Sequence, residues 1–364
     1  MTEPNRTPIP WQQQNASFTQ GQHPAEPPRI MPPAPPVLGG EFQPPRELTE
    51  LEYHRLSHAD ARTRWWSPLL EGLTGGFIYA IFNVVAGLIF AVWAMNSGAT
   101  EADFTLEGLQ TKSLSSPAFF FLMFGTVALM FPALWLARLI CRPKPWGLIH
   151  SVVGRMRWSW LFLCMGISIV LFVLLPVVFE LITGGSFAVE ARIPATTLIW
   201  MMVLVFLLVP LQCYAEELVF RGYLMQTLGR WLKHPAWAII LPAPLFMLGH
   251  AYDMWGQLSI LVMGLAAGFM VWYTGGLEAS IAMHVVNNVY LMFMGVIGLV
   301  DPYAQEGSTF VDFLWATGIE LLLVVVIMYA ARKVGITRRV TFPVVISPQR
   351  WVHMSAEEKA QAIR

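Results

Sequence analysis

The chain has 364 residues, of which 55% are hydrophobic and only 13% are charged, and its formal net charge is zero. Since an average soluble domain carries about 25% charged residues, this composition argues against a soluble globule and favours a membrane protein with several spanning segments. Nothing in the charge balance points to a nucleic-acid partner.

Residues 1–65 are expected to form a disordered, proline-rich cytoplasmic tail. Twelve of the 26 prolines fall within residues 1–48, and no apolar periodicity is sustained there. Such a composition buries too little apolar surface to fold alone and favours polyproline-II conformations. A signal peptide has a positively charged segment followed by an apolar one. This region has no such pair of segments, so we do not interpret it as a signal peptide.

Eight apolar runs follow, each near the ~20 residues that a helix needs to cross a bilayer. They cover approximately residues 71–95, 117–140, 157–183, 196–218, 236–253, 257–275, 277–299 and 309–331. The fifth run is the shortest. We therefore predict an all-α polytopic membrane protein with about eight transmembrane helices over residues 66–339. Residues 340–364 are expected to form a second cytoplasmic tail.

The basic residues indicate the orientation of these helices. Lys and Arg gather before the first run, between the second and third, between the fourth and fifth, and after the eighth, whereas the alternate loops contain few. Arg155, Arg230 and Lys333 are examples. Because basic loops stay on the cytoplasmic side, both termini should be cytoplasmic.

Three polar clusters interrupt the fourth, fifth and seventh apolar runs. The first contains Glu216, Glu217 and Arg221, the second Phe246 and His250, and the third His284 and Asn288. Ionisable side chains at membrane depth are costly, so they are rare and usually functional. We therefore expect these clusters to form one intramembrane site that faces the cytoplasm.

Helical spacing divides the first cluster into two roles. Glu217 and Arg221 are four positions apart, with the glutamate first, which is the better order for an ion pair. Glu216 points about 100° away from Glu217 on an α-helix. We therefore predict a structural pair of Glu217 and Arg221 and a catalytic Glu216. Phe246 is interpreted as an apolar support beneath His250.

The depths of these residues agree only under one condition. If the fourth helix continues to about Trp231, Glu216 lies ~20 Å from its cytoplasmic end. His250 then lies at a similar depth, ~22 Å from the start of the fifth helix near Pro235. If the fourth helix ended at residue 218, the shared site would not form.

The chemistry of the set fits the hydrolysis of a peptide bond. Glu216 and His250 can activate a water molecule as a general base. His284 and Asn288 lie on one helix face and can donate to a developing oxyanion. Alternatively, Glu216, His250 and His284 form a His₂Glu set that could bind catalytic zinc. We favour the mechanism without a metal or other cofactor.

The order Glu-Glu-x-x-x-Arg, Phe-x-x-x-His and His-x-x-x-Asn resembles the CPBP intramembrane protease family, which includes the type II CAAX prenyl endopeptidases. The resemblance covers about residues 196–300. It implies a glutamate-dependent endopeptidase in a bacterial plasma membrane. Carried over by motif, Glu216 and His250 activate water, and His284 and Asn288 form the oxyanion site. The implied partners are the lipid bilayer and a peptide or protein substrate, whose lipidation stays open.

Two other functions remain open. A proton-coupled transporter also uses intramembrane carboxylates and histidines, but it predicts internal repeats, and none is evident. A non-catalytic immunity or scaffold protein would be a member of the family without its activity. The sequence does not predict the substrate or the oligomeric state.

Overall fold

The computed structural model describes residues 46–59, 64–141, 145–184, 193–303, 307–346 and 348–362. Within these ranges, seven helical segments are long and apolar enough to cross a membrane. The all-α polytopic fold is thereby confirmed. The segments are Ser67–Ser97, Pro117–Cys141, Trp158–Ile182, Ala195–Trp231, Met254–Thr274, Glu278–Val296 and Phe310–Val334.

Several of these segments combine more than one element. α1 is Ser67–Ser97, and the second segment contains α3 (Pro117–Phe120), η4 (Phe121–Gly125), α4 (Thr126–Ala128) and α5 (Met130–Cys141). The third contains α6 (Trp158–Ile169), η6 (Val170–Leu174) and α7 (Leu175–Ile182), whereas α12 (Met254–Thr274), α13 (Glu278–Val296) and α14 (Phe310–Val334) are uninterrupted. Short helices η3 (Glu101–Phe104), α2 (Leu106–Ser113) and η5 (Trp146–Ile149) lie in connections.

The fifth predicted run is a shorter apolar helical segment, Pro235–Leu248. It consists of α10 (Pro235–Ile240) and α11 (Pro242–Leu248). Pro242 has no N–H for a helical hydrogen bond and its ring clashes with the preceding turn, which explains the interruption. The expected eight helices are therefore seven long segments and this short one.

The fourth segment meets the depth condition for a shared site. α8 (Ala195–Glu217) continues through the π-helix η7 (Leu218–Leu224) into α9 (Met225–Trp231), and together they span 37 residues. The helix therefore reaches Trp231, as the alignment of Glu216 with His250 requires.

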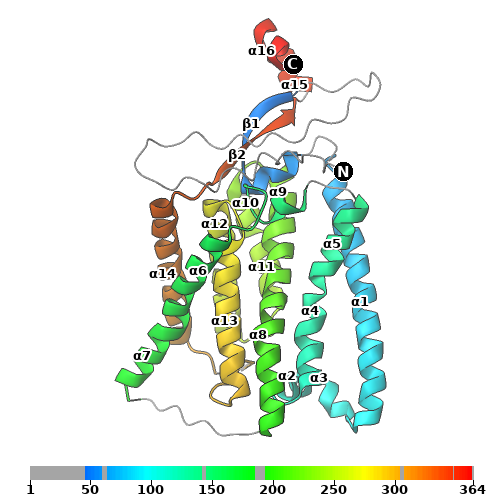
Figure 1. Cartoon of the computed structure of the whole chain (residues 1–364), viewed down its shortest axis with the longest axis vertical. Coiled ribbons are helices and arrows are strands. Elements are labelled where there is room, and N and C mark those ends of the chain that lie inside the picture. The colour runs from blue at the N-terminus through cyan, green and yellow to red at the C-terminus, as the bar shows by residue number, and fades with distance from the viewer. Residues whose placement is uncertain are drawn as a thin grey trace, which may run out of the picture.

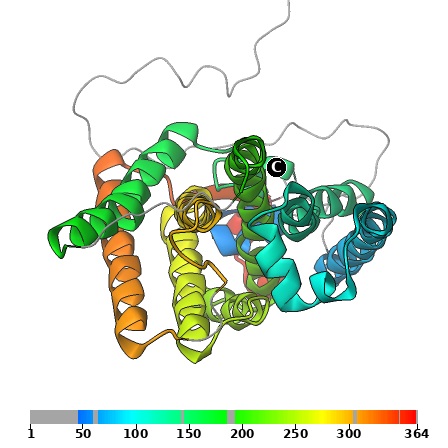
Figure 2. The same ribbon diagram turned by 90° about the horizontal axis from the view of Figure 1, so that it is seen from below.

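Helices α8 and α13 occupy the middle of the bundle. α13 packs against α8 and α6, and α12 packs against α11, α13 and α14. Seen from below, α1 and α14 lie toward opposite edges, with α8 and α13 between them (Figure 1 and Figure 2). Of the seven segments, α13 is the most enclosed by protein. The polar residues of α8 and α13 are therefore shielded from lipid by their neighbours.

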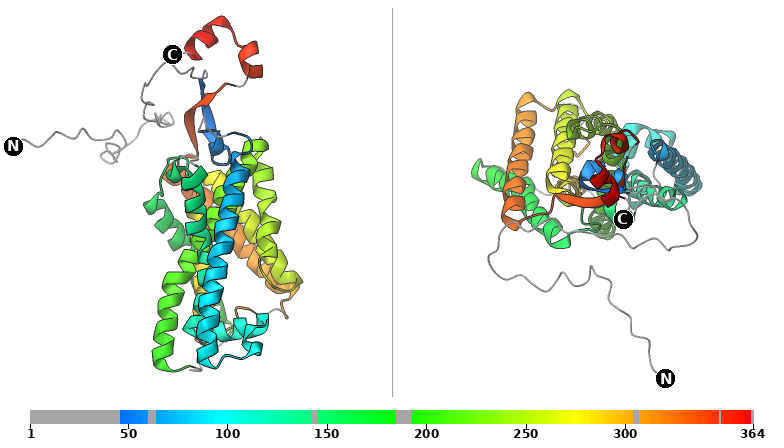
Figure 3. Two further views of the ribbon diagram at one scale, coloured as in Figure 1. Left: turned by 90° about the vertical axis from the view of Figure 1, so that its right-hand side faces the viewer. Right: turned by 90° about the horizontal axis from the view of Figure 1, so that it is seen from above.

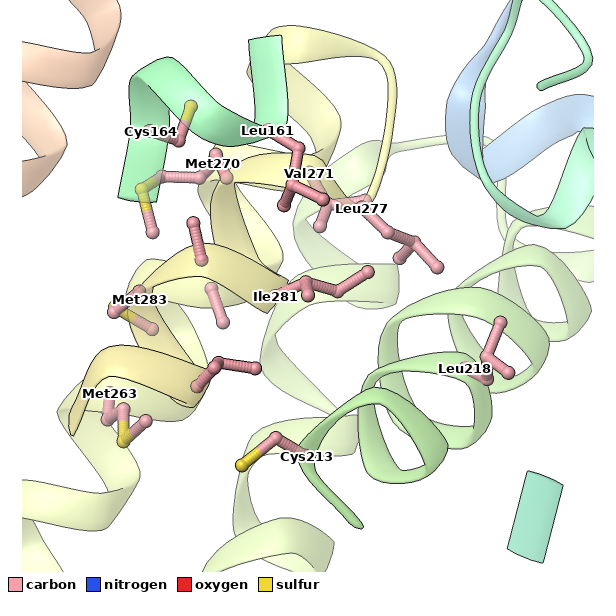
Figure 4. Close-up of a cluster of buried hydrophobic side chains, with 14 of the residues drawn as sticks. Leu161, Cys164, Cys213, Leu218, Met263, Met270, Val271, Leu277, Ile281 and Met283 are labelled. Atoms are coloured by element: carbon pink, nitrogen blue, oxygen red, sulfur yellow. The ribbon is translucent and has the colours of Figure 1, made fainter. Parts of the chain in front are cut away.

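A buried apolar cluster joins α6, α12 and α13 beside these polar residues. Figure 4 shows Cys164 of α6, Met270 of α12 and Ile281 of α13 among its members, with Cys213 of α8 at its edge. Cys164 and Met270 are fully buried. Close packing of this kind fixes the position of α13 relative to α8.

Two segments that are far apart in the sequence meet at one end of the bundle, where β1 (Arg46–Glu52) pairs in antiparallel register with β2 (Arg339–Val345). Both strands rise from the same end of the helices, and α15 (Pro348–His353) and α16 (Ala356–Ala362) follow β2 (Figure 3). Exposed Arg339 pairs with Glu50 and Glu52 across the strands.

The 3₁₀ helix η2 (Tyr53–Ala59) follows β1 and packs against α9. Tyr53 and Leu56 are fully buried, and Nη1 of Arg55 donates to the Gly229 carbonyl at 2.6 Å. A Cβ atom at Gly229 would collide with the carbonyl oxygen of His54, so the close approach requires glycine.

The sequence predicts that residues 46–59 belong to the N-terminal tail, but in the structure they form β1 and η2. The difference arises because β1 gains its hydrogen bonds from a strand at the other end of the chain. The predicted disordered tail before Arg46 lies outside the described residues, so that part and the domain boundaries remain predictions.

Candidate active site

Glu216 and Glu217 end α8, and Arg221 lies in the π-helix η7 that follows. Glu216 is 8% exposed and Glu217 is 1% exposed, so both carboxylates are inside the protein at membrane depth. π-Helical turns within α-helices are rare and occur often at functional sites. The structure also has π-helical turns outside the site, in η4 and η6, so this geometry alone does not identify it.

His284 of α13 lies between the two carboxylates. Its Nδ1 is 3.0 Å from Oε1 of Glu217, and its Nε2 is 3.4 Å from Oε2 of Glu216. Spacing on an ideal α-helix predicted that the two glutamates face apart. Both nevertheless reach one imidazole, because their side chains are long and the two ring nitrogens lie on opposite edges.

The ion pair predicted from the i,i+4 spacing is present. Nη1 of Arg221 donates to Oε1 of Glu217 at 2.9 Å, and both side chains are almost fully buried. The same oxygen also faces His284, so Glu217 does not belong to Arg221 alone. Two carboxylates, one arginine and one histidine therefore form a connected polar group.

The ring of Phe246, on α11, packs against several of these polar side chains. Its ring centroid lies 4.8 Å from that of His250 and 5.6 Å from that of His284. The Arg221 guanidinium carbon lies 4.1 Å above the same ring. Phe246 is 1% exposed. It therefore supports residues from all three clusters, and not His250 only.

His250 lies just beyond the end of α11. Its Nδ1 is 2.9 Å from the Phe246 carbonyl oxygen. Because a carbonyl only accepts, this contact assigns the hydrogen to Nδ1 and leaves a lone pair on Nε2 of the neutral ring. Nε2 of Gln257 also donates to the backbone carbonyl of His250. Both contacts hold the histidine at the end of its helix.

Asn288 lies one turn after His284 on α13, where the predicted i,i+4 relation places it. Its Oδ1 accepts a hydrogen bond from Nδ2 of Asn287 at 3.0 Å. Because Oδ1 of Asn288 accepts this hydrogen bond, the Nδ2 group of Asn288 stays available to donate to another group. Asn287 is thus a neighbour that orients Asn288.

The alternative metal set is not assembled in this conformation. Within the described residues, no group of three or more His, Cys, Asp or Glu side chains could hold a metal ion. Both nitrogens of His284 already face carboxylates. As they are placed here, Glu216, His250 and His284 do not form such a group, and we derive no step through a metal.

A further pair beside the site was not anticipated from the sequence. Nε2 of His150, in the connection between α5 and α6, lies 2.7 Å from the hydroxyl of Tyr214 on α8. Burial lowers the pKa of His150 to about 4, so this ring is neutral at pH 7. The contact ties the connection to α8 two residues before Glu216. No motif signals it, because the partners are 64 positions apart.

Comparison with known proteins identifies the same central segment. Residues 195–290 match the family model for Rce1-like type II CAAX prenyl endopeptidases. The chain is 26% identical over 175 residues to YyaK of Bacillus subtilis, which is described as uncharacterized. That alignment covers 44% of this chain and 56% of YyaK, so the chain spans about half the length of this relative. No solved structure matches the chain.

The matched segment contains all three polar clusters, from Glu216 to Asn288. Rce1-like proteins are, in general, intramembrane CAAX-type proteases, and the seven apolar segments are those of an integral membrane protein. The resemblance expected from the three motifs is therefore confirmed, and residues 195–290 are Rce1-like in sequence.

Proposed function

We propose that the protein is an intramembrane endopeptidase that hydrolyses a peptide bond with a water molecule activated by Glu216 and His250. The observation that supports this most is the convergence of residues from all three clusters around His284 and Phe246. The site lies within the Rce1-like segment. The proposed substrate is a peptide or protein at the membrane, and the site is proposed to face the cytoplasm of a bacterial cell.

The carboxylate of Glu216 suits the role of general base. Its Oε2 is buried and has no hydrogen-bond partner among the described residues. It can accept a proton from water while Nε2 of His250 orients the same molecule. The hydroxide then attacks the carbonyl carbon. The proton passes to the leaving nitrogen as the C–N bond breaks.

His284 and Asn288 are proposed to stabilise the tetrahedral intermediate. Arg221 contacts the carboxylate of Glu217, and His284 contacts the carboxylates of both Glu216 and Glu217. Glu217 holds Nδ1 of His284, and Nε2, which lies 3.4 Å from Oε2 of Glu216, is proposed to donate to the oxyanion when both ring nitrogens carry hydrogen. The Nδ2 group of Asn288 supplies the second donor. In this arrangement Glu217 and Arg221 position His284 and do not touch the substrate.

The function is tested with purified protein in proteoliposomes and a library of membrane-tethered peptides, with products read by mass spectrometry. We expect cleavage of some peptides at one defined bond. A protein that moves protons across the vesicle membrane and cuts nothing would instead be a transporter. A protein with neither activity would be a non-catalytic relative of the family.

Removal of metal ions is expected to leave the proposed cleavage unchanged. The reason is that the carboxylate and the imidazoles suffice for the mechanism, and no group of three candidate metal ligands was found among the described residues. The measurement compares cleavage rates before and after exhaustive chelation. Loss of activity that stoichiometric zinc restores would contradict this mechanism and favour a metalloprotease.

Replacing Arg221 with alanine is expected to reduce the yield of folded protein more than it reduces the rate of the chemical step. The change leaves Glu217 buried with His284 as its remaining partner, and breaking such a pair costs about 3–5 kcal/mol. The yield is measured by size-exclusion chromatography, with Arg221→Lys as the charge-preserving control. A well-folded Arg221→Ala variant without turnover would place Arg221 in the catalytic machinery.

A further inference from the structure

Three basic residues lie at the end of α14 from which the chain continues into β2 (Figure 1). Arg332 and Lys333 are in the last turn of this helix, and Arg338 follows its C-cap residue, Gly335, by three positions. All three residues are exposed, and we call them the basic cluster. The helix dipole favours basic residues in the last turn of a helix, but it does not explain Arg338, which lies beyond that turn.

Tyr273 of α12 brings two members of the basic cluster together. Nε of Arg332 donates to the Tyr273 hydroxyl at 2.7 Å. The guanidinium carbon of Arg338 lies 4.0 Å from the centroid of the same ring, and that of Arg332 lies 6.0 Å from it. Tyr273 is 5% exposed, so the bundle holds its ring in place. Two positive charges therefore converge on one fixed side chain, and an anion beside both would relieve their repulsion.

No carboxylate among the described residues balances these charges. Two carboxylates lie near Tyr273, because the residues on either side of it contact one of them or its partner. One belongs to Glu278, which pairs with Arg157, and the other to Glu52, which pairs with Arg339. Neither forms an ion pair with the basic cluster. Since arginine stays charged at any pH that the protein meets, the cluster attracts an anion from outside the chain.

The basic cluster lies at the depth of the lipid headgroups. α14 has 25 residues and is therefore ~37 Å long, whereas the hydrocarbon core of a bilayer is ~30 Å thick. A helix of this length reaches the headgroup region at both ends. Tyr329, one turn before Lys333, is 62% exposed, and its ring centroid lies 5.5 Å from Nζ of Lys333. An exposed tyrosine beside a lysine at a helix end is typical of a membrane interface.

An apolar surface extends from the basic cluster toward the middle of the bilayer. Leu321, Leu322 and Val325 of α14 are exposed, and they precede the cluster on the same helix. A soluble anion or an acidic peptide bound at the cluster would leave this surface uncovered. A lipid whose headgroup binds there has its acyl chains at the depth of these side chains and can cover them.

We propose that the basic cluster binds the phosphate of an anionic phospholipid. A guanidinium has five N–H donors, and the bond of Arg332 to Tyr273 leaves the others for phosphate oxygens. Arg338 supplies a second set of donors, and Lys333 adds a third positive charge. A zwitterionic lipid binds less tightly, because its own ammonium group is repelled by the cluster. This inference does not depend on the proposed peptidase function.

The binding is measured by native mass spectrometry of the full-length protein in detergent with added phosphatidylglycerol or phosphatidylcholine. We expect phosphatidylglycerol to bind more tightly. Arg332→Ala and Arg338→Ala should each lower the affinity for phosphatidylglycerol about 5-fold, the contribution of one basic residue to the binding of anionic lipid. Equal affinities of the wild-type protein for the two lipids would overturn the proposal.

Two further variants distinguish a formed site from a general attraction by positive charge. Tyr273→Phe keeps every charge but releases Arg332 from its hydrogen bond, so we expect the affinity to fall about 2-fold. Arg339→Ala is the matched control, because it removes an exposed arginine that already pairs with two glutamates. It should keep the wild-type affinity. Equal losses in Arg339→Ala and Arg338→Ala would indicate a diffuse attraction and contradict the site.

A second measurement distinguishes a lipid from a soluble anion. Phosphatidylglycerol should raise the melting temperature of the wild-type protein in detergent, because a ligand of the folded state stabilises it. The increase should be smaller in Arg338→Ala, whose exposed position outside the helices makes the change compatible with folding. Inorganic phosphate or a hexaglutamate peptide at the same concentration should give no increase. An increase of equal size with either one would refute the assignment to a lipid.

Discussion

Replacing Glu216 with glutamine is expected to lower the rate of peptide cleavage by about 10²–10⁴-fold, the usual contribution of a general base. Glutamine keeps the shape of the side chain but cannot take a proton from water. The 3.4 Å contact of Oε2 with Nε2 of His284 is not a hydrogen bond, so the change should disturb the fold little. His250→Ala is expected to cause a loss in the same range.

The rates are measured with one cleavable peptide in proteoliposomes. The matched control is Glu320→Gln, since Glu320 is another buried carboxyl in a membrane-spanning helix, α14, outside the proposed site. It should cleave at the wild-type rate. Folded Glu216→Gln and His250→Ala variants with undiminished cleavage would show that the proposed mechanism is wrong.

Replacing Arg157 with alanine is expected to destabilise the protein by about 3–5 kcal/mol. The guanidinium of Arg157 makes two hydrogen bonds to Glu278, at 2.9 and 2.6 Å, and one each to the carbonyls of Thr274 and Thr337. Glu278 is fully buried. The variant leaves this carboxylate without its charged partner, with only the backbone N–H of residue 157 still donating to it, and releases three side-chain connections that meet at one end of α13.

Thermal unfolding in detergent measures this loss, with Arg339→Ala as the control. Arg339 also pairs with two glutamates, but its side chain is 52% exposed, so its removal should cost under about 1 kcal/mol. The double variant Arg157→Ala/Glu278→Gln should recover part of the stability, because no buried charge remains unpaired. Equal melting temperatures for Arg157→Ala and Arg339→Ala would refute this account.

The helices and the approximate place where the polar clusters meet could be predicted from the sequence, because both depend on local patterns. Apolar runs of about 20 residues define spans, and polar residues within them are conspicuous. The continuation of the fourth helix to Trp231 followed from requiring one depth for Glu216 and His250, and the structure meets it. The pair of Glu217 and Arg221 followed from their spacing.

The remaining features depend on contacts between distant parts of the chain. His284 joins Glu216 to Glu217 through a packing of α13 on α8 that no spacing rule contains. The contact of His150 with Tyr214 has the same origin. The roles assigned to Glu216, His250, His284 and Asn288 stay predictions until cleavage is measured.

The pairing of β1 with β2 has a consequence for how the protein is assembled during synthesis. Arg339 contacts Glu52 across 287 positions of sequence, so β1 leaves the ribosome long before its partner exists. The surface of η2 that packs on α9 must likewise wait for residues near Gly229. Domains generally fold in the order of their synthesis. In this chain the first described segment to be made is among the last to find its place.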